Sequence, residues 1–277
     1  MRLVSLSPAV TEILFALKKG HLIIARDQFS NFPDEVKIIP KIAGHQNVDI
    51  SALQSYAPDL VFTSTIIQKH LAEEIRTAGI ECIHQDPRSL HEIYQSILEI
   101  GTLLDCEADA RALTERMRLG MNEVRRRAQN LPCRPRLYIE EWPALENTSG
   151  GHDPPYASGN WVPEIARIAG GDPFDSSACA GIVQGKQLLS HRDNQLSFPV
   201  TFDQIQKWNP ELIILSICGA GALADPALIT KRSGWEALPA IQKGRVRVID
   251  DSLLNRPGPR LMEGAQRLYA WIFEMLH

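Results

Sequence analysis

The sequence lacks the features that mark membrane-spanning and nucleic-acid-binding proteins. Its 277 residues contain no apolar run approaching the ~20 residues that a helix needs to span a bilayer. Lys and Arg number 29 against 33 Asp and Glu, and the resulting net charge of −4 gives no global electrostatic reason to bind nucleic acid or anionic lipid. We expect a soluble protein with no nucleic-acid partner.

Cysteine is scarce, and its spacing indicates no framework. The five cysteines lie far apart and include no C-x-x-C pair, which favours small buried thiols in a reducing compartment over disulfides or a zinc site. Met1 and Arg2 run directly into a strand pattern at Leu3–Leu6, without the parts of a secretory signal. We therefore expect a cytoplasmic location for the chain as encoded. A periplasmic or cell-surface location would follow if Met1 is not the true start.

Motifs for catalysis and metal binding are also missing. There is no G-x-S-x-G, H-x-H or H-E-x-x-H pattern. The one constellation worth naming is His152 beside Asp153, with Glu140 and Glu141 nearby, and an ordinary loop histidine is the simpler interpretation. Glu140 and Glu141 end a predicted strand, so they should point to opposite faces and not form an acid and base pair. We expect no catalytic residues, no metal site and no intrinsic cofactor.

What the chain does contain is a regular alternation of apolar runs with helical patterns, which is typical of an α/β fold. Near the N-terminus, Ser7 and Pro8 form a helix start, and the helical spacing continues until Gly20, which we expect to end the helix. The predicted strands are Leu3–Leu6, His21–Ala25, Leu60–Thr63, Glu81–His84, Leu137–Ile139, Leu212–Ile217 and Val246–Ile249.

A long amphipathic helical pattern separates two blocks of predicted strands. Its apolar face consists of Ala110, Leu113, Met117, Met121 and Val124. We place a first α/β lobe at 1–105, the connecting helix at 106–130 and a second α/β lobe at 131–277.

A weak internal repeat supports two related lobes. Residues 49–61 align with residues 201–213, and each segment is a capped short helix that leads into a buried strand. Two lobes of this type, each with a central parallel sheet, predict a ligand cleft between them, faced by the carboxyl ends of strands. The segment Gly219–Ala224 matches G-x-G-x-x-A, but Pro226 interrupts the helix that should follow, so a loop is favoured over a dinucleotide site.

Six segments, in order along almost the whole chain, carry a shared pattern: Leu3–Leu14, Ala57–Val61, Gly159–Glu164, Ala169–Gly171, Trp235–Ala240 and Arg256–Arg260. Together they resemble one family, the cobalamin and ferric-siderophore substrate-binding proteins of ABC importers. Trp161–Glu164 and Arg256–Arg260 look most like the cobalamin-binding branch. The resemblance implies two Rossmann-like lobes joined by one long helix, with the ligand between them.

Cobalamin is the ligand that this resemblance favours, and a ferric siderophore or haem is the alternative within the family. A cytosolic enzyme or cofactor-handling protein that reuses the fold is the alternative outside it. Aromatic and polar residues at predicted strand ends suit a flat ligand. We expect one wall of the site to contain Ser7, Pro8, Asp27, Phe29, Thr63, Ser64, Thr65 and Asp86. We expect the other wall to contain Trp142, Trp161, Asp251, Asn255 and Arg256.

The resemblance also implies an ABC permease as partner, docked through one acidic residue on each lobe. Asp203 stands at the implied position in the second lobe, but the first lobe has Ser51 there. Asp49 is most simply a helix N-cap, and Asp203 also fits a first-turn carboxylate favoured by the helix dipole. Permease docking through Asp203 is thus a weaker expectation than ligand binding, and we expect a monomer.

Overall fold

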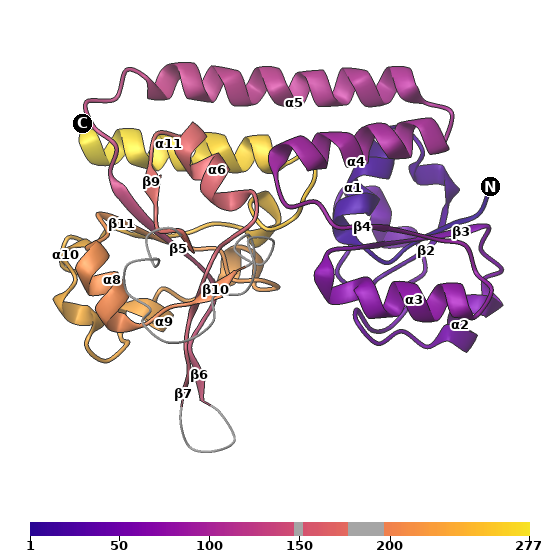
Figure 1. Cartoon of the computed structure of the whole chain (residues 1–277), viewed down its shortest axis with the longest axis horizontal. Coiled ribbons are helices and arrows are strands. Elements are labelled where there is room, and N and C mark those ends of the chain that lie inside the picture. The colour runs from indigo at the N-terminus through magenta and orange to yellow at the C-terminus, as the bar shows by residue number, and fades with distance from the viewer. Residues whose placement is uncertain (147–151, 177–196) are drawn as a thin grey trace. The chain divides into compact units, whose positions relative to one another are not determined.

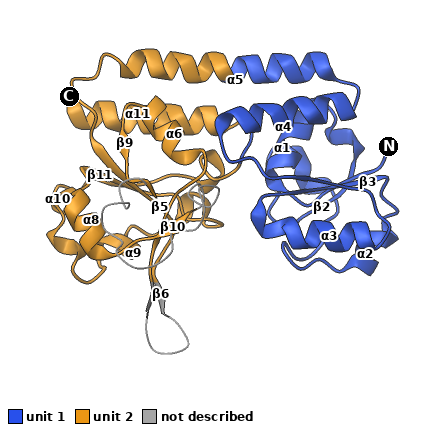
Figure 2. Ribbon diagram, in the orientation of Figure 1, with its two compact units in different colours: residues 1–117, 257–259 blue, residues 118–256, 260–277 orange. Residues whose placement is uncertain are grey.

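The computed structural model describes residues 1–146, 152–176 and 197–277, which form two compact units (Figures 1 and 2). Unit 1 comprises Met1–Met117 and Pro257–Pro259, and unit 2 comprises Arg118–Arg256 and Arg260–His277. The boundary falls inside the long helix α5 (Glu107–Ala128). The predicted lobe boundaries at 105 and 130 and the predicted cleft between the lobes stay predictions.

Unit 1 is a parallel sheet covered by helices on both faces. Its strand order is β2-β1-β3-β4, and every pairing is parallel. Helices α1 and α4 cover one face, and α2 and α3 cover the other (Figure 1). The strands are β1 (Leu3–Ser5), β2 (Ile23–Arg26), β3 (Leu60–Ser64) and β4 (Cys82–Gln85). The helices are α1 (Pro8–Ala16), α2 (Ile50–Ser55), α3 (Lys69–Thr77) and α4 (Leu90–Leu103), with short 3-10 turns η1 (Gly20–Leu22), η2 (Asp34–Ile38) and η3 (Ile66–Gln68).

The first strand-to-helix turn forms as the sequence predicts, but the helix ends differently. The Ser7 side chain accepts from the Val10 N–H, and Pro8 occupies the first turn of α1. The predicted stop at Gly20 is wrong, because α1 ends at Ala16. Lys18 adopts φ 60, and the Lys19 N–H donates to the Leu14 carbonyl at 2.8 Å, which closes the helix before Gly20 is reached.

Helix α5 has the amphipathic character that its sequence predicts. Its apolar face is fully packed: Ala110, Leu113, Met117, Met121 and Val124 are each at most 2% exposed. Its last turn carries Arg125, Arg126 and Arg127, which complement the C-terminal end of the helix dipole. In the described part of the chain, every helix is too short or too polar to cross a membrane.

Unit 2 contains a mixed sheet of order β10-β8-β5-β11-β12, in which β9 also pairs with β5. The pairings of β5, β11, β12 and β9 are parallel, whereas β8 and β10 are added antiparallel at one edge. The strands are β5 (Arg136–Trp142), β6 (Leu145–Glu146), β7 (His152–Asp153), β8 (Tyr156–Ala157), β9 (Asp172–Pro173), β10 (Phe198–Pro199), β11 (Leu212–Leu215) and β12 (Val246–Val248). The helices are α6 (Val162–Ile168), α8 (Phe202–Trp208), α9 (Ala227–Thr230), α10 (Pro239–Gln242) and α11 (Leu261–Leu276), with 3-10 turns η5 (Gly221–Leu223), η6 (Trp235–Ala237) and η7 (Asp251–Leu253).

All seven predicted strands are present as β1, β2, β3, β4, β5, β11 and β12. The internal repeat is also confirmed as structure. Asp49 caps α2, which leads into β3, and Thr201 forms a capping box with Gln204 at α8, which leads into β11.

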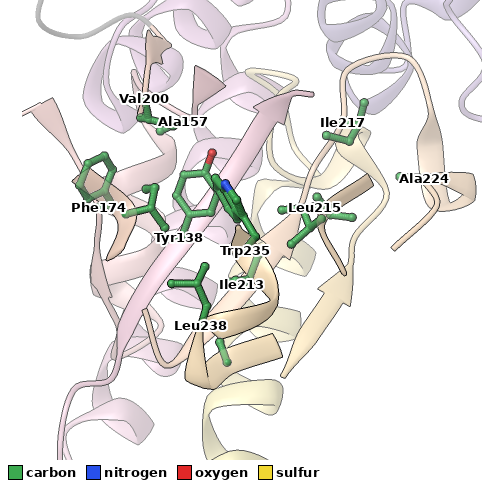
Figure 3. Packing of buried hydrophobic residues seen from close by; sticks show 13 residues of the cluster. Tyr138, Ala157, Phe174, Val200, Ile213, Leu215, Ile217, Ala224, Trp235 and Leu238 are labelled. Atoms are coloured by element: carbon green, nitrogen blue, oxygen red, sulfur yellow. The ribbon is translucent and has the colours of Figure 1, made fainter. Parts of the chain in front are cut away.

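The core of unit 2 is aromatic and includes a buried ion pair. Tyr138 and Trp235 are 0% and 2% exposed and pack with their ring centroids 5.6 Å apart (Figure 3). Arg232 makes two hydrogen bonds, of 2.8 and 2.7 Å, to the fully buried carboxylate of Glu140. The guanidinium also lies 4.4 Å over the Trp235 ring. This network holds the loop between α9 and η6 against the carboxyl end of β5.

Candidate functional site

The four strands of unit 1 run parallel, so their carboxyl ends lie at one edge of the sheet. Ligands of open α/β sheets bind outside this edge. Ser7, Asp27, Ser64 and Asp86 follow β1, β2, β3 and β4 or close them, so the fold places all four predicted residues along it.

A chain of buried hydroxyl groups connects the first two of these strand ends. Ser5 Oγ donates to the Ser7 carbonyl at 3.1 Å, and Thr11 Oγ1 donates to Ser5 Oγ at 2.9 Å. Thr11 Oγ1 also lies 2.8 Å from Ser30 Oγ, which donates to the Asp27 carboxylate. These side chains use their hydrogen-bonding groups on one another, so this part of the sheet edge is a fixed scaffold beneath the surface.

Asp27 shapes the loop that follows β2. Its carboxylate is 0% exposed and accepts the Phe29 N–H at 3.1 Å and the Ser30 N–H at 3.0 Å. Asp27 therefore positions its neighbours from below the surface. Phe29 is held by this loop and is 43% exposed.

Two residues that the sequence analysis did not select, His45 and Gln68, join this edge. The Gln68 side chain is fully buried and accepts the Ser64 N–H at 2.8 Å. Its Nε2 donates to the carbonyls of Leu6 at 2.7 Å and His45 at 2.8 Å. Gln68 lies five residues beyond the predicted strand Leu60–Thr63, and its place in the loop after a strand was a usable signal. The sequence around His45 carried no such signal, because only the fold brings its contacting side chains close to it.

The backbone beside Gln68 is strained at a predicted site residue. Thr65 has φ 65 and ψ 158, a region that is essentially restricted to glycine and that costs about 1–3 kcal/mol. The next two residues, Ile66 and Ile67, are 41% and 48% exposed. Large apolar side chains held at this exposure by a strained turn indicate a binding surface.

Thr63 and Asp86 belong to a separate group at β4. Thr63 Oγ1 lies 3.0 Å from His84 Nδ1, and Arg88 donates to the Asp86 carboxylate at 2.5 Å. Burial is the main cause that lowers the pKa of His84, and His84 Nε2 is buried without a partner. Among the described residues, no hydrogen bond or ion pair links this group to Asp27 or Gln68.

In unit 2, polar side chains gather where β5 and β11 end. Asn255 Nδ2 donates to the Ser216 carbonyl at 2.7 Å and to Cys218 Sγ at 3.2 Å. The Cys218 thiol contacts Glu141 at 3.5 Å, and Ser197 donates to the same carboxylate at 2.6 Å. Asp251 accepts the N–H groups of Gly219 and Gly221 at 3.1 and 2.9 Å.

The electrostatics of this cluster favour binding over covalent chemistry. Burial raises the pKa of the Cys218 thiol, and the neighbouring Glu141 raises it further. Burial also raises the pKa of Glu141. A thiol kept protonated in this way is a poor nucleophile. A phosphate bound at Gly219–Ala224 would need the backbone N–H groups of this loop. Two of these groups already donate to Asp251, which favours an ordinary loop over a dinucleotide site.

The remaining predicted residues of unit 2 differ in accessibility. Trp142 is 45% exposed at the end of β5. Trp161 is only 3% exposed, and its indole N–H donates to the Leu254 carbonyl at 2.6 Å. This geometry favours the packing role of Trp161 over stacking on a ligand. Arg256 is partly exposed.

The structure also shows where the residues considered for metal binding and acid-base chemistry lie. Glu140 contacts Tyr138 and Arg232, whereas Glu141 contacts Ser197 and Cys218, so the two carboxylates face opposite sides as predicted. The side chains of His152 and Asp153, and all of Cys179, lie outside the described residues. Across the residues that the structure describes, no group of three or more His, Cys, Asp or Glu side chains could hold a bare metal ion.

The predicted docking residue, Asp203, is exposed in the first turn of α8. Asp49 caps α2 by accepting from the Ser51 N–H and hydroxyl, both at 2.8 Å, and these hydrogen bonds lower the pKa of Asp49. Asp49 therefore has the capping role expected from sequence.

Comparison with known proteins points to one family. The profile of the periplasmic binding protein family matches residues 3–253. The uncharacterized ABC transporter substrate-binding lipoprotein YvrC of Bacillus subtilis is 27% identical, over 98% of this chain and 80% of that protein. The vitamin B12-binding protein of Vibrio cholerae is 22% identical, over 98% and 88%. The periplasmic heme-binding protein RhuT of Roseiflexus sp. RS-1 matches in structure with a TM-score of 0.80 and 23% identity, over 100% of this chain and 99% of that one.

Proposed function

Because the chain belongs to the periplasmic binding protein family, we propose that it is the substrate-binding component of an ABC importer and that its ligand is a corrinoid or a related metal chelate. The relatives named as ABC transporter and vitamin B12-binding proteins align over nearly the whole chain, which supports this assignment. Cobalamin is the first candidate ligand, and haem is the second.

The observation that carries the proposal is the exposed apolar surface at the carboxyl edge of unit 1. Phe29, Ile66 and Ile67 are each more than 40% exposed there, and they are fixed by the buried contacts of Asp27 and Gln68. A flat macrocycle buries this kind of surface well, because it offers a wide apolar face with polar groups only at its rim.

Calorimetric titration of the purified protein tests the proposal directly. Cyanocobalamin, haem and a ferric hydroxamate are the three ligands, and one of them should bind one-to-one with a Kd of about 1 μM or tighter. Phe29→Ala should weaken that binding by roughly tenfold, as expected for a lost aromatic contact. Leu103→Ala changes an apolar side chain on α4 that is 37% exposed and serves as the matched control.

Failure of all three ligands to bind would overturn the proposed ligand class. Recovery of a chemically altered ligand after incubation would instead indicate an enzyme. Chromatography of the ligand before and after binding distinguishes these cases, and we expect the ligand to be recovered unchanged.

We further propose that the protein is monomeric and that it engages a permease through the exposed face that carries Asp203. Light scattering should give the monomer mass of 30.9 kDa. Asp203→Lys should leave ligand affinity unchanged but abolish stimulation of the partner transporter's ATPase, because it reverses a charge that the permease would pair. Glu236→Lys, at another acidic residue in unit 2, is the control.

A further inference from the structure

The polar side chains at the carboxyl ends of β5 and β11 in unit 2 form one group, which we call the edge cluster. Glu141, Cys218 and Asn255 of this cluster are each partly exposed, so a ligand at this edge can reach them. The other members are Ser197, Ser216 and Asp251. The hydrogen bonds that the cluster already makes decide which ligand groups it can still bind.

The donors around Asn255 are used within the edge cluster. Asn255 Nδ2 donates to the Ser216 carbonyl at 2.7 Å and to Cys218 Sγ at 3.2 Å. The Ser216 hydroxyl donates to Asn255 Oδ1 at 3.0 Å. A side-chain amide has two N–H groups and a hydroxyl has one O–H, so Asn255 and Ser216 have no further donor to offer to a ligand.

The donors around the two carboxylates are used in the same way. The Ser197 hydroxyl donates to Glu141 Oε2 at 2.6 Å, and the Cys218 thiol donates to Glu141 Oε1 at 3.5 Å. Asp251 accepts two backbone N–H groups of the loop Gly219–Ala224, one on each oxygen. A carboxylate has about four acceptor sites, so each can accept further hydrogen bonds. Within the described residues, the edge cluster therefore offers a ligand acceptors and not donors.

The edge cluster also carries negative charge. Burial is the largest cause that raises the pKa of Glu141 and of Cys218, and the charge of Asp251 raises the pKa of both further. Arg232, which lies at the end of β5, makes two hydrogen bonds to Glu140, so its charge is already balanced. A ligand carboxylate at the edge cluster would meet like charge and a set of donors that are already in use.

The backbone of β5 is irregular at Glu141. Glu140 pairs with Ala157 and Trp142 pairs with Tyr156, the adjacent residue of β8, so Glu141 is the extra residue of a β-bulge. Bulges of this kind re-aim a side chain and are frequent beside active sites. Trp142, directly after Glu141, is 45% exposed and adds an aromatic surface against which a flat ligand can pack.

We propose that Glu141 selects the bound macrocycle by the chemistry of its rim. The carboxylate accepts N–H groups from a rim of uncharged carboxamides and repels a rim that carries carboxylates. This inference rests on the proposed function, because it requires a macrocycle at the carboxyl edge of unit 2. Of the candidate ligands, it selects the corrinoid, whose rim carries amides, over haem, whose propionate groups are carboxylates.

The test compares ligands that share a ring and a metal but differ in the charge of the rim. Cyanocobalamin is paired with its isomeric monocarboxylic acids, in each of which one peripheral amide is hydrolysed to a carboxylate. Ferric haem is paired with its dimethyl ester. The titrations are made at pH 8, well above the ordinary pKa of a carboxyl group. At least one acid isomer should bind roughly tenfold or more weakly than cyanocobalamin, and haem should bind more weakly than its ester.

Glu141→Gln is the variant that isolates the charge. Its amide keeps the size of the side chain and an oxygen that can accept from Ser197. The readout is the ratio of the affinities for the two members of a pair. We expect the preference for cyanocobalamin over its acid to fall to less than about threefold. Glu211→Gln is the matched control, because Glu211 directly precedes β11, at the opposite edge of the same sheet, and its side chain is 38% exposed.

Three results would overturn the assignment and leave the proposed function standing. In the first, no acid isomer binds the wild-type protein more weakly than cyanocobalamin, or haem binds more tightly than its ester, which would instead indicate that the partly exposed Arg256 receives the rim carboxylates. This comparison needs no variant, so it stands whether or not Glu141→Gln folds. In the others, Glu141→Gln leaves the preference intact, or Glu211→Gln removes it equally. Failure of every macrocycle to bind the wild-type protein would overturn both proposals.

Discussion

Replacing Arg232 with Met tests whether the buried ion pair with Glu140 stabilises unit 2. The substitution keeps the apolar stem of the side chain and removes two hydrogen bonds, of 2.8 and 2.7 Å, from a carboxylate that is 0% exposed. Removing one partner of a buried ion pair costs about 3–5 kcal/mol, because the remaining charge stays buried. We expect Arg232→Met to lower the free energy of unfolding by about this amount at pH 8.

The stability that Arg232→Met removes should depend on pH, and the pKa of Glu140 sets the direction of that dependence. Burial raises the pKa of Glu140, and Arg232 acts against burial by lowering it. Without Arg232 the pKa of Glu140 rises further, so the folded protein binds a proton that the unfolded chain releases near its ordinary pKa of about 4.3. Stability then falls as pH rises from the unfolded pKa through the folded one. The penalty should therefore be smaller near pH 4.5 than at pH 8.

Arg126→Met is the matched control. Arg126 makes the same two-pronged contact with Glu123, at 2.9 and 2.8 Å, but its side chain is 66% exposed. Solvent screens such a pair, so we expect no measurable change in stability. Urea unfolding followed by far-UV circular dichroism gives both values.

Two results would refute this reasoning: equal urea midpoints for Arg232→Met and Arg126→Met, or a penalty that does not change between pH 4.5 and pH 8. The double variant Glu140→Met with Arg232→Met should be more stable than Arg232→Met alone, because it leaves no unpaired buried charge.

Four other substitutions test the site. Thr65→Gly should raise stability by about 1 kcal/mol, since relief of backbone strain exceeds the entropy cost of glycine; calorimetry that shows no gain, or an equal gain for Thr65→Ala, would contradict this. Trp161→Ala should lose about 3–5 kcal/mol of stability in urea unfolding, whereas Phe29→Ala should stay within about 0.5 kcal/mol; the reverse order would return Trp161 to the ligand surface. Gly44→Ala should destabilise the protein by about 1 kcal/mol or more, because Gly44 has φ +95 and a Cβ there would overlap the Asn47 carbonyl oxygen; an unchanged urea midpoint would show that the loop tolerates a side chain.

Local sequence patterns predicted the elements of this fold accurately where the signal was long or capped. The seven main strands are buried apolar runs, and Ser7, Asp49 and Thr201 start helices through hydrogen bonds that need only nearby backbone. The short strands β6 to β10 span two residues each and are defined by their pairing partners, so no local pattern could show them. Helix α1 ended early because Lys18 took a conformation that glycine normally supplies.

The residues of the candidate site also divide into those that local sequence patterns could select and those that they could not. Asp27, Phe29 and Thr65 could be selected because they follow predicted strands, and parallel strands end at one edge. The sequence could not separate the exposed Phe29 from the buried Trp161, since both are aromatic residues near strand ends and only packing decides their exposure.

By itself, therefore, the sequence determined the α/β class, the caps, the amphipathic long helix and the strand ends that carry polar and aromatic residues, because each depends on neighbours within a few positions along the chain. The tertiary structure alone decided the His45 arrangement. Asp27, His45 and Gln68 are separated by 18 and 23 residues, and no periodicity relates residues so far apart. They meet because three chain segments converge on one edge of a parallel sheet, where long-range hydrogen bonds fix a loop that has no regular structure of its own.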